Sequence, residues 1–185
     1  MSIATKTGDA GQTSLMYGRR VPKSNPRVDA NGCVDELNAA LGFARVTAPD
    51  AFTQKLLLSV QKELIFLMGE LATAPDDLPR YQKDGYQLTS AAMVDRLTAA
   101  IDELEKDKLL HYKGWAIPGS TIVSAALDIA RTTCRRAERR IALLGEEEPS
   151  VNPEILRYLN RLSDLCWLLA RYAEHAKGAR PTEPV

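Results

Sequence analysis

The chain has too little histidine and cysteine for the common protein metal sites. It has two histidines, His111 and His175, and three cysteines that form no C-x-x-C pair. Structural zinc sites need several cysteine or histidine ligands, and di-iron helical bundles need Glu-x-x-His repeats, which this sequence does not contain. We therefore expect no metal site built from protein ligands, and the odd number of separated cysteines predicts reduced, buried thiols rather than a disulfide framework.

The chain also has no excess charge and no long apolar run. Its 24 lysines and arginines balance 24 aspartates and glutamates, whereas a general nucleic-acid binder needs a broad basic surface. No apolar stretch approaches the roughly 20 residues of a membrane-spanning helix, and the first residues contain no apolar signal-peptide core. We therefore predict a cytoplasmic protein with neither a nucleic-acid nor a membrane partner.

Apolar residues at helical spacing are abundant, and they predict an all-α fold. The pattern favours helices over five segments, 29–46, 51–73, 90–104, 121–144 and 153–177, and mostly short links between them favour a five-helix antiparallel bundle. No segment has a clear strand pattern, and 74–88 is expected to be a loop. We predict a single domain over 1–185, with a polar arm (1–27), a bundle (28–177) and a disordered tail (178–185). The expected buried stripe of the fourth helix is Ile122, Ala126, Ile129, Thr133, Ala137 and Ile141.

The most unusual segment lies in that fourth helix and reads Arg131-Thr-Thr-Cys-Arg135-Arg136-Ala-Glu138-Arg139-Arg140, with five arginines and one acid. Residues three and four apart share a helix face, so one stripe contains Asp128, Arg131, Arg135 and Glu138. Guanidinium groups match carboxylates and phosphates in shape and charge. On this segment alone two interpretations stay open, an ordinary charged face that makes ion pairs and an anion site for a polyphosphate.

Three other polar segments also allow two interpretations each. The glycines, hydroxyls and lysine of segment 5–14 suit the wrapping of backbone amides around phosphates, although on its own such a composition is more typical of a flexible leader. Asp35 lies among apolar helix positions, which favours a partly buried arginine partner, whereas Glu36 is expected in solvent. Asn160 and Asp164 share one face of the last helix, either at a site or on the wet surface.

Together these segments resemble the ATP:cob(I)alamin adenosyltransferases of the PduO type. The resemblance runs in order over nearly the whole chain, and its motifs are the arm, Arg20-Val-Pro-Lys23, the segment 34–45 (VDELNAALGFAR), Pro118-Gly119, Arg131 to Arg139, and the segment 158–164 (YLNRLSD). It implies a homotrimer with active sites between adjacent subunits. It also implies transfer of the 5′-deoxyadenosyl group of ATP to cob(I)alamin, which yields adenosylcobalamin and triphosphate.

The resemblance further implies roles for individual residues. Catalytic roles fall to Arg135, Arg131 and Asp35, the last two paired across the subunit interface. The ATP-binding positions are Thr5, Lys6, Thr7, Gly8, Thr13, Ser14, Lys23, Arg135, Arg136, Ala137, Glu138, Arg139 and Asn160. Mg²⁺ is expected on the phosphates without a protein cage, and the expected partners are a flavoprotein reductase and an adenosylcobalamin-dependent enzyme.

Two residues depart from the family pattern. Asn31 replaces a usual aromatic residue, and Trp115 replaces a usual phenylalanine in the cobalamin pocket. The alternative for Trp115 is a plain core residue. For the whole chain the alternatives are a non-catalytic ATP- or corrinoid-binding bundle, and a helical protein whose arginines only hold an oligomer together.

Overall fold

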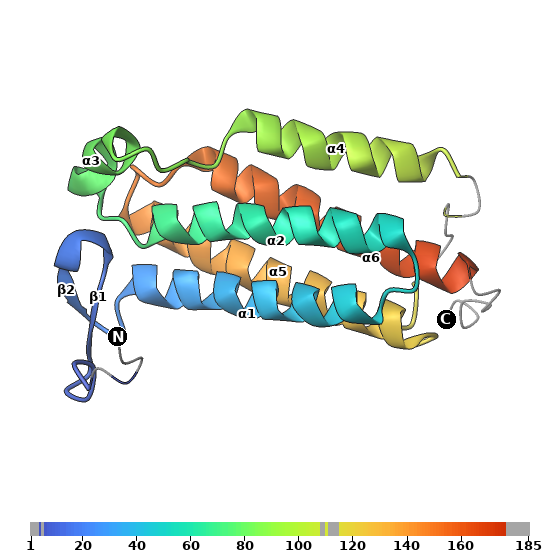
Figure 1. The fold of residues 1–185 in the computed structure, drawn as a ribbon, viewed down its shortest axis with the longest axis horizontal. Helices are drawn as coiled ribbons and strands as arrows, with labels where there is room; N and C mark the ends of the chain where they lie inside the picture. Colours follow the sequence, from blue (N-terminus) through green and yellow to red (C-terminus); the bar gives the residue numbers. More distant parts are fainter. Residues whose placement is uncertain (1–3, 5, 108–109, 111–114, 177–185) are drawn as a thin grey trace.

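Long helices dominate the computed structural model, which describes residues 4, 6–107, 110 and 115–176. Successive long helices run in opposite directions, and the neighbouring pairs are α1 with α5, α5 with α6, α1 with α2, and α4 with α6 (Figure 1). The predicted mostly helical fold is confirmed. The long helices are α1 (Pro26–Thr47), α2 (Ala51–Leu71), α4 (Ala91–Glu105), α5 (Ile122–Glu147) and α6 (Pro153–Ala176).

The short elements of the arm and of segment 74–88 were not predicted from the sequence. Two strands, β1 (Gln12–Ser14) and β2 (Arg20–Pro22), form an antiparallel pair in the arm. A strand of three residues is too short for its alternation to be recognised in a sequence. The segment expected to be a loop contains a sixth helix, α3 (Leu78–Lys83), preceded by a 3₁₀ turn at Pro75–Asp77.

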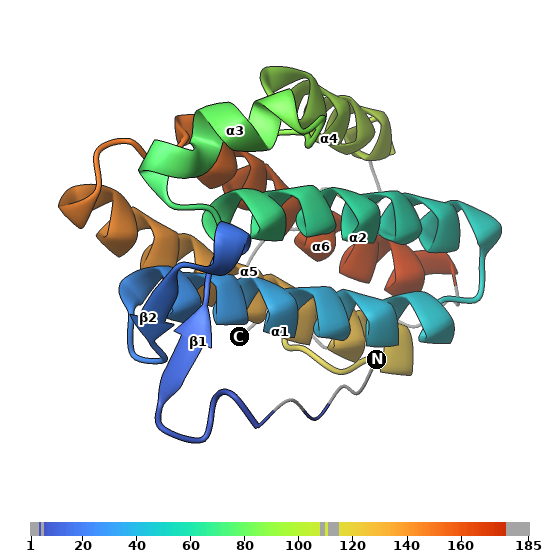
Figure 2. The same ribbon diagram turned by 60° about the vertical axis from the view of Figure 1, so that its left-hand side comes forward.

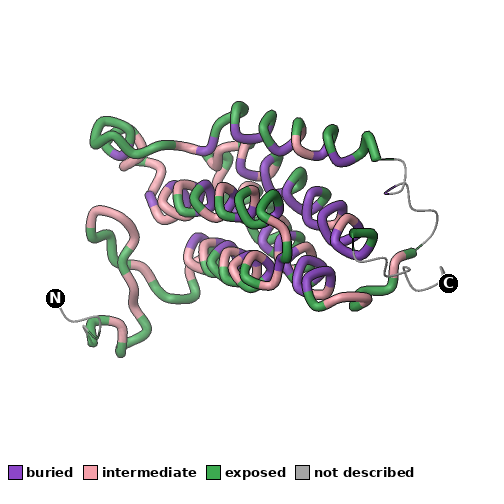
Figure 3. The backbone as a smooth tube through the Cα atoms, turned by 45° about the vertical axis from the view of Figure 1, so that its right-hand side comes forward, coloured by how far each residue is buried: buried purple, intermediate pink, exposed green. Residues whose placement is uncertain are grey.

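The core lies between the helices, and the burial pattern corrects the predicted face of α5. Figure 3 shows the buried stripes turned inward along each long helix. Ala126, Ala137 and Ile141 are buried as expected, but Ile122 and Ile129 are exposed and Thr133 is only half-buried. The true stripe mixes small and large apolar residues, and α5 packs through it against α1 and α6 at once. That stripe contains Val123, Ala126, Leu127, Ala130, Cys134, Ala137, Ile141 and Leu144.

Two predicted helix ends also need correction. α1 begins at Pro26 rather than Asp29, because the Asn25 side chain accepts a hydrogen bond from the Arg27 amide (2.9 Å) and proline suits the first turn. α5 continues through Gly145 to Glu147 instead of ending there. Glycine destabilises a helix by only about 1 kcal/mol, which the packing of the last turn offsets.

Hydrogen-bonding side chains cap the starts of two long helices. Thr121 and Ser124 form a reciprocal capping box at the start of α5, and Asn152 caps α6. All three cysteines are free and buried. Among the described residues no helix has the length and apolarity that crossing a membrane requires. The predicted tail lies outside the described residues.

Candidate functional site

The arginines of α5 point to two different neighbours. Arg136 forms an ion pair with Glu36, and Arg140 Nε lies 3.2 Å from an Asp29 carboxylate oxygen, so both pair with acids of α1. The predicted stripe instead follows α6. At one of its ends Asp128 pairs with Arg171, and at the other the Asn160 amide donates to Glu138 (3.2 Å).

Arg135 and Arg139 differ from the other arginines of the helix. Both side chains are exposed, and no hydrogen bond or ion pair holds either one within the described part of the chain. A guanidinium group without a carboxylate partner is free to bind a phosphate with its fork of donors.

Glu138 and Asn160 border a pocket beside these arginines. The pocket has a volume of about 250 Å³, and Leu156, Arg157 and Arg161 complete its lining. Arg161 also donates to the side-chain Oδ1 of Asn160 (3.2 Å), which fixes this side-chain amide between the two helices. The two predicted ATP-binding positions Glu138 and Asn160, which lie on different helices, therefore meet in one pocket.

Arg131 and Asp35 do not pair with each other within the described part of the chain. Arg131 is 30 % exposed, and its Nε lies 3.5 Å from an Asp128 oxygen. Asp35 is exposed on α1, and no side chain of the described part of this chain pairs with it. The partly buried arginine partner expected for Asp35 is therefore not supplied within the described subunit.

The arm is a closed hairpin that gathers several predicted ATP-binding positions. The Lys23 amide donates to the Gly11 carbonyl (2.9 Å), and Arg20 donates to the Ser14 hydroxyl (3.1 Å) and the Thr7 carbonyl (2.8 Å). A Cβ atom at Gly8 would lie 3.2 Å from Lys23 Nζ, so a larger residue would push the ammonium aside. Thr13 lies in β1, Lys6 is exposed, and Thr5 lies outside the described residues.

The tip of this hairpin is fastened to the bundle beside α3 (Figure 2). The Met16 amide donates to the Ala72 carbonyl (2.8 Å), and Arg19 pairs with Asp77. The Tyr17 hydroxyl donates to Asp84 (2.9 Å), and Arg80 lies over the Tyr17 ring at 4.1 Å. Loss of hydration and the Asp84 carboxylate together raise the pKa of Tyr17 to about 12. We call the contacts of Met16, Tyr17 and Arg19 with the bundle the arm latch.

The structure describes both residues that depart from the family pattern, Trp115 and Asn31. Trp115 is 81 % exposed, so it is not a core residue of this subunit. It precedes a shallow pocket of about 260 Å³ lined by Pro118, Gly119, Ala125, Asp128, Ile129 and Thr132. Asn31 is half-buried, and its Oδ1 has no hydrogen-bond partner among the described residues.

Sequence reasoning missed the buried ionic residues Arg171 and Glu174 and the whole arm latch. The two α6 residues follow the apolar run Leu168-Leu169-Ala170 at the spacing of one helical turn, which was the available signal. The latch had no such signal, because its partners are 56 or more positions apart. No group of three or more histidine, cysteine, aspartate or glutamate residues in the described part could hold a metal ion.

Comparison with known proteins agrees with this arrangement. The cobalamin adenosyltransferase family model matches residues 3–173. The chain is 40 % identical over 174 residues to the corrinoid adenosyltransferase PduO of Salmonella typhimurium, but spans only about half (49 %) of that protein. It is also 40 % identical to a cobalamin adenosyltransferase of Cupriavidus metallidurans, with 95 % of this chain and 90 % of the relative covered.

A solved structure is similar over almost the same length. It is a variant of a PduO-type ATP:corrinoid adenosyltransferase from Lactobacillus reuteri in complex with cobalamin and ATP, 33 % identical, with a TM-score of 0.87 and 98 % of both chains covered. The matched segment includes the arm, the arginine-rich helix and the Asn160 region. The chain belongs to the cobalamin adenosyltransferase family.

Proposed function

We propose that this chain transfers the 5′-deoxyadenosyl group of ATP to cob(I)alamin and releases adenosylcobalamin and triphosphate. The observation that carries the proposal is the pair Arg135 and Arg139, which no carboxylate holds within the described part of the chain. On α5 they lie one helical turn before and directly after Glu138, which lines the pocket with Asn160. Family membership supplies the substrates, because a relative of the same architecture binds both cobalamin and ATP.

The reaction places its main electrostatic demand on the leaving group. Co(I) donates an electron pair to the 5′ carbon of ATP, a Co–C bond forms, and the C5′–O bond breaks with its electrons on triphosphate. Cationic donors that are already in place stabilise charge that develops in the transition state. Arg135 and Arg139 would hold the polyphosphate, with Lys6 and Lys23 closing over it from the arm.

The arm would be the lid of the nucleotide site. Its hairpin brings Thr7, Gly8 and Lys23 together, and its latch holds the tip of the hairpin against the bundle. Backbone amides around glycine suit phosphate oxygens. Mg²⁺ would accompany the triphosphate through its oxygens, and we assign it no protein ligand.

We propose a homotrimer in which the α1 and α5 surfaces meet neighbouring subunits. Phe43 and Val46 on α1, with Ile122 and Ile129 on the adjacent α5, are large apolar side chains left exposed in the single chain. Asp35 lies on the same α1 stripe, two helical turns before Phe43. In this arrangement the Asp35 carboxylate reaches Arg131 of the next subunit, and the active site lies between the two.

The corrinoid would lie beside the connector that precedes α5. Trp115 is exposed there next to an apolar pocket. A large apolar side chain over the lower face of the corrin ring would exclude an axial ligand, which favours reduction of Co(II). A flavoprotein reductase would supply the electron, and an adenosylcobalamin-dependent enzyme would use the product.

The test is to mix the protein with ATP, cobalamin and a reductant and to follow the corrinoid absorption spectrum. We expect conversion to adenosylcobalamin, with a reaction without ATP as the control. Binding of both substrates without conversion would support the non-catalytic alternative instead. If the protein bound neither substrate, the result would support the alternative in which its arginines only hold an oligomer together.

A further inference from the structure

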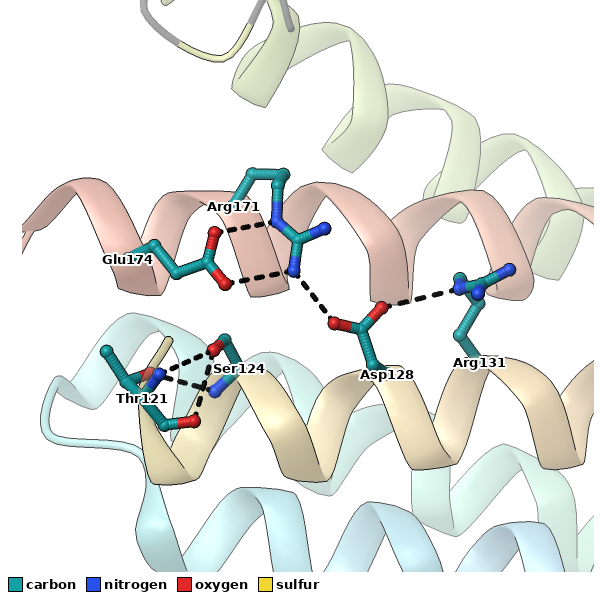
Figure 4. Close-up of polar contacts among 6 residues, drawn as sticks. All are labelled: Thr121, Ser124, Asp128, Arg131, Arg171 and Glu174. Carbon is teal, nitrogen blue, oxygen red and sulfur yellow. Dashed lines mark hydrogen bonds and ion pairs between the residues drawn. The ribbon is translucent and has the colours of Figure 1, made fainter. Parts of the chain in front are cut away.

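A buried ionic cluster lies directly beneath Arg131. Asp128, Arg171 and Glu174 are 5 %, 3 % and 1 % exposed. One terminal nitrogen of Arg171 donates to Asp128 (2.8 Å) and to Glu174 (3.0 Å), while its Nε lies 2.9 Å from the second Glu174 oxygen. Figure 4 shows the Asp128 carboxylate between the guanidinium groups of Arg171 and Arg131.

Stability alone does not explain this cluster. Removing two charges from water is expensive, and apolar residues of similar volume often stabilise a core equally well or better. The cluster is also imperfectly satisfied, because Nε and Nη1 of Arg171 and Nε of Arg131 form no hydrogen bond among the described residues. The two Nε atoms make only ion-pair contacts, at 2.9 Å to Glu174 and 3.5 Å to Asp128. A fixed geometry at such a site is better explained by what it holds in place.

The cluster holds one partly exposed group, and that group is Arg131. Asp128 offers one oxygen to Arg171 at 2.8 Å and the other to Arg131 Nε at 3.5 Å. The contact with Arg131 is therefore the looser one, and it engages only the Nε edge of the guanidinium. With Arg171 present the four charges sum to zero, so Arg131 is not drawn fully inward to neutralise the buried acids.

A capping box starts α5 one turn before Asp128. The Thr121 and Ser124 side chains and amides bond reciprocally at 3.0 Å, which anchors the helix backbone there. Asp128 also borders the shallow pocket next to the connector. The Asp128 carboxylate itself is held from α6, by Arg171.

We propose that Arg171 is a positioning residue for the transfer reaction, because it fixes Asp128 and so aims the terminal nitrogens of Arg131 out of the subunit. This inference rests on the proposed function, in which Arg131 meets Asp35 of a neighbouring subunit. Arg171 itself touches no substrate. Its loss should leave ATP binding intact and slow the chemical step.

The test removes the buried pair without leaving a net charge. In the variant Arg171→Met/Glu174→Leu, we expect kcat to fall about tenfold while the KM for ATP stays within about twofold. The matched control is Arg27→Met/Glu148→Leu, the same exchange at another arginine–glutamate pair of the bundle, joined at 2.7 Å. There we expect kcat per folded molecule within about twofold of wild type.

A double-mutant cycle identifies the route through Asp128. If Arg171 acts through this carboxylate, adding Arg171→Met/Glu174→Leu to Asp128→Asn should lower kcat no further. The inference would be overturned if the losses in kcat multiplied when the variants were combined. It would also be overturned if Arg171→Met/Glu174→Leu left kcat unchanged.

A second readout separates this inference from the proposed reaction. If wild type makes no adenosylcobalamin, the proposed function fails. Sedimentation at graded protein concentrations then tests whether Arg171 holds the terminal nitrogens of Arg131 pointing out of the subunit, toward Asp35 of a neighbour. We expect self-association to weaken about tenfold on removal of the pair, and only where Asp35 is present. A monomeric wild type, or equal weakening in an Asp35→Asn background, would overturn it.

Discussion

The arginines of α5 differ in whether a carboxylate already holds them, although one short sequence encodes them all. Arg136 and Arg140 pair with acids of α1, and Arg131 is tethered to the buried Asp128. Arg135 and Arg139 have no such partner in the described part of the chain. A phosphate that binds the second group breaks no existing ion pair, whereas a phosphate that binds the first must compete with one.

This comparison is tested most strongly at Arg135. Arg135→Ala should lower kcat/KM for ATP by roughly 100-fold, because removing one donor from a desolvated anion site costs about 3 kcal/mol of transition-state stabilisation. Arg140→Ala is the matched control on the same helix, where an exposed ion pair contributes about 1 kcal/mol or less. A loss at Arg135 below about threefold, in a folded protein, would remove it from the site.

Arg131 tests the intermediate case, an arginine with a partner inside the chain and a proposed one outside it. Arg131→Met and Asp35→Asn should each weaken activity and self-association by about 2 kcal/mol. The double variant should be milder than the sum of the singles, measured by kinetics and sedimentation. Additive losses would mean that the two residues do not meet.

Trp115 lets us compare an exposed aromatic residue with a buried one. Since it is exposed, Trp115→Ala should lower the free energy of unfolding by about 0.5 kcal/mol or less, instead of the roughly 3–5 kcal/mol typical of a core position. Turnover from Co(II) with an enzymatic reductant should fall far more than turnover from chemically prepared Co(I). Equal losses in the two assays would exclude a role in reduction.

Changes in the arm should have the smallest effect on the stability of the bundle and the clearest effect on how fast a protease cleaves the arm. Limited trypsin digestion should cleave the arm several-fold more slowly with MgATP than without it, since the lid closes over the nucleotide. Tyr17→Ala should speed cleavage of the free protein and leave the unfolding midpoint of the bundle nearly unchanged. Equal cleavage with and without MgATP would show that the arm is not a lid.

Helix positions could be predicted because each long helix repeats its apolar residues over many turns, and the caps Thr121 and Asn152 mark their starts. The buried face of α5 could not be predicted in full, because that face includes alanine, cysteine and the polar Ser124 and Asp128, while the large apolar Ile122 and Ile129 face outward. A single-chain periodicity argument assigns such isoleucines to the core. It has no means of recognising an apolar surface that, in the proposed homotrimer, would face a neighbouring subunit.

The candidate site was predicted where one segment contained it and missed where distant segments meet. The stripe from Asp128 to Glu138 lies within one helix, so spacing alone predicts it. The meeting of Glu138 with Asn160, and of Asp128 with Arg171, depends on how α5 and α6 align. The arm latch joins Tyr17 to Asp84 across the bundle end, and only the packed structure shows it.

The central claim is that Arg135 and Arg139, which have no carboxylate partner among the residues that the structure describes, form the polyphosphate site. Calorimetric titration of inorganic tripolyphosphate with Mg²⁺ into wild type, Arg135→Ala and Arg140→Ala measures it without any corrinoid chemistry. The account predicts that Arg135→Ala weakens binding by more than about tenfold, while Arg140→Ala stays within about threefold of wild type. Equal affinities for the two variants would contradict it.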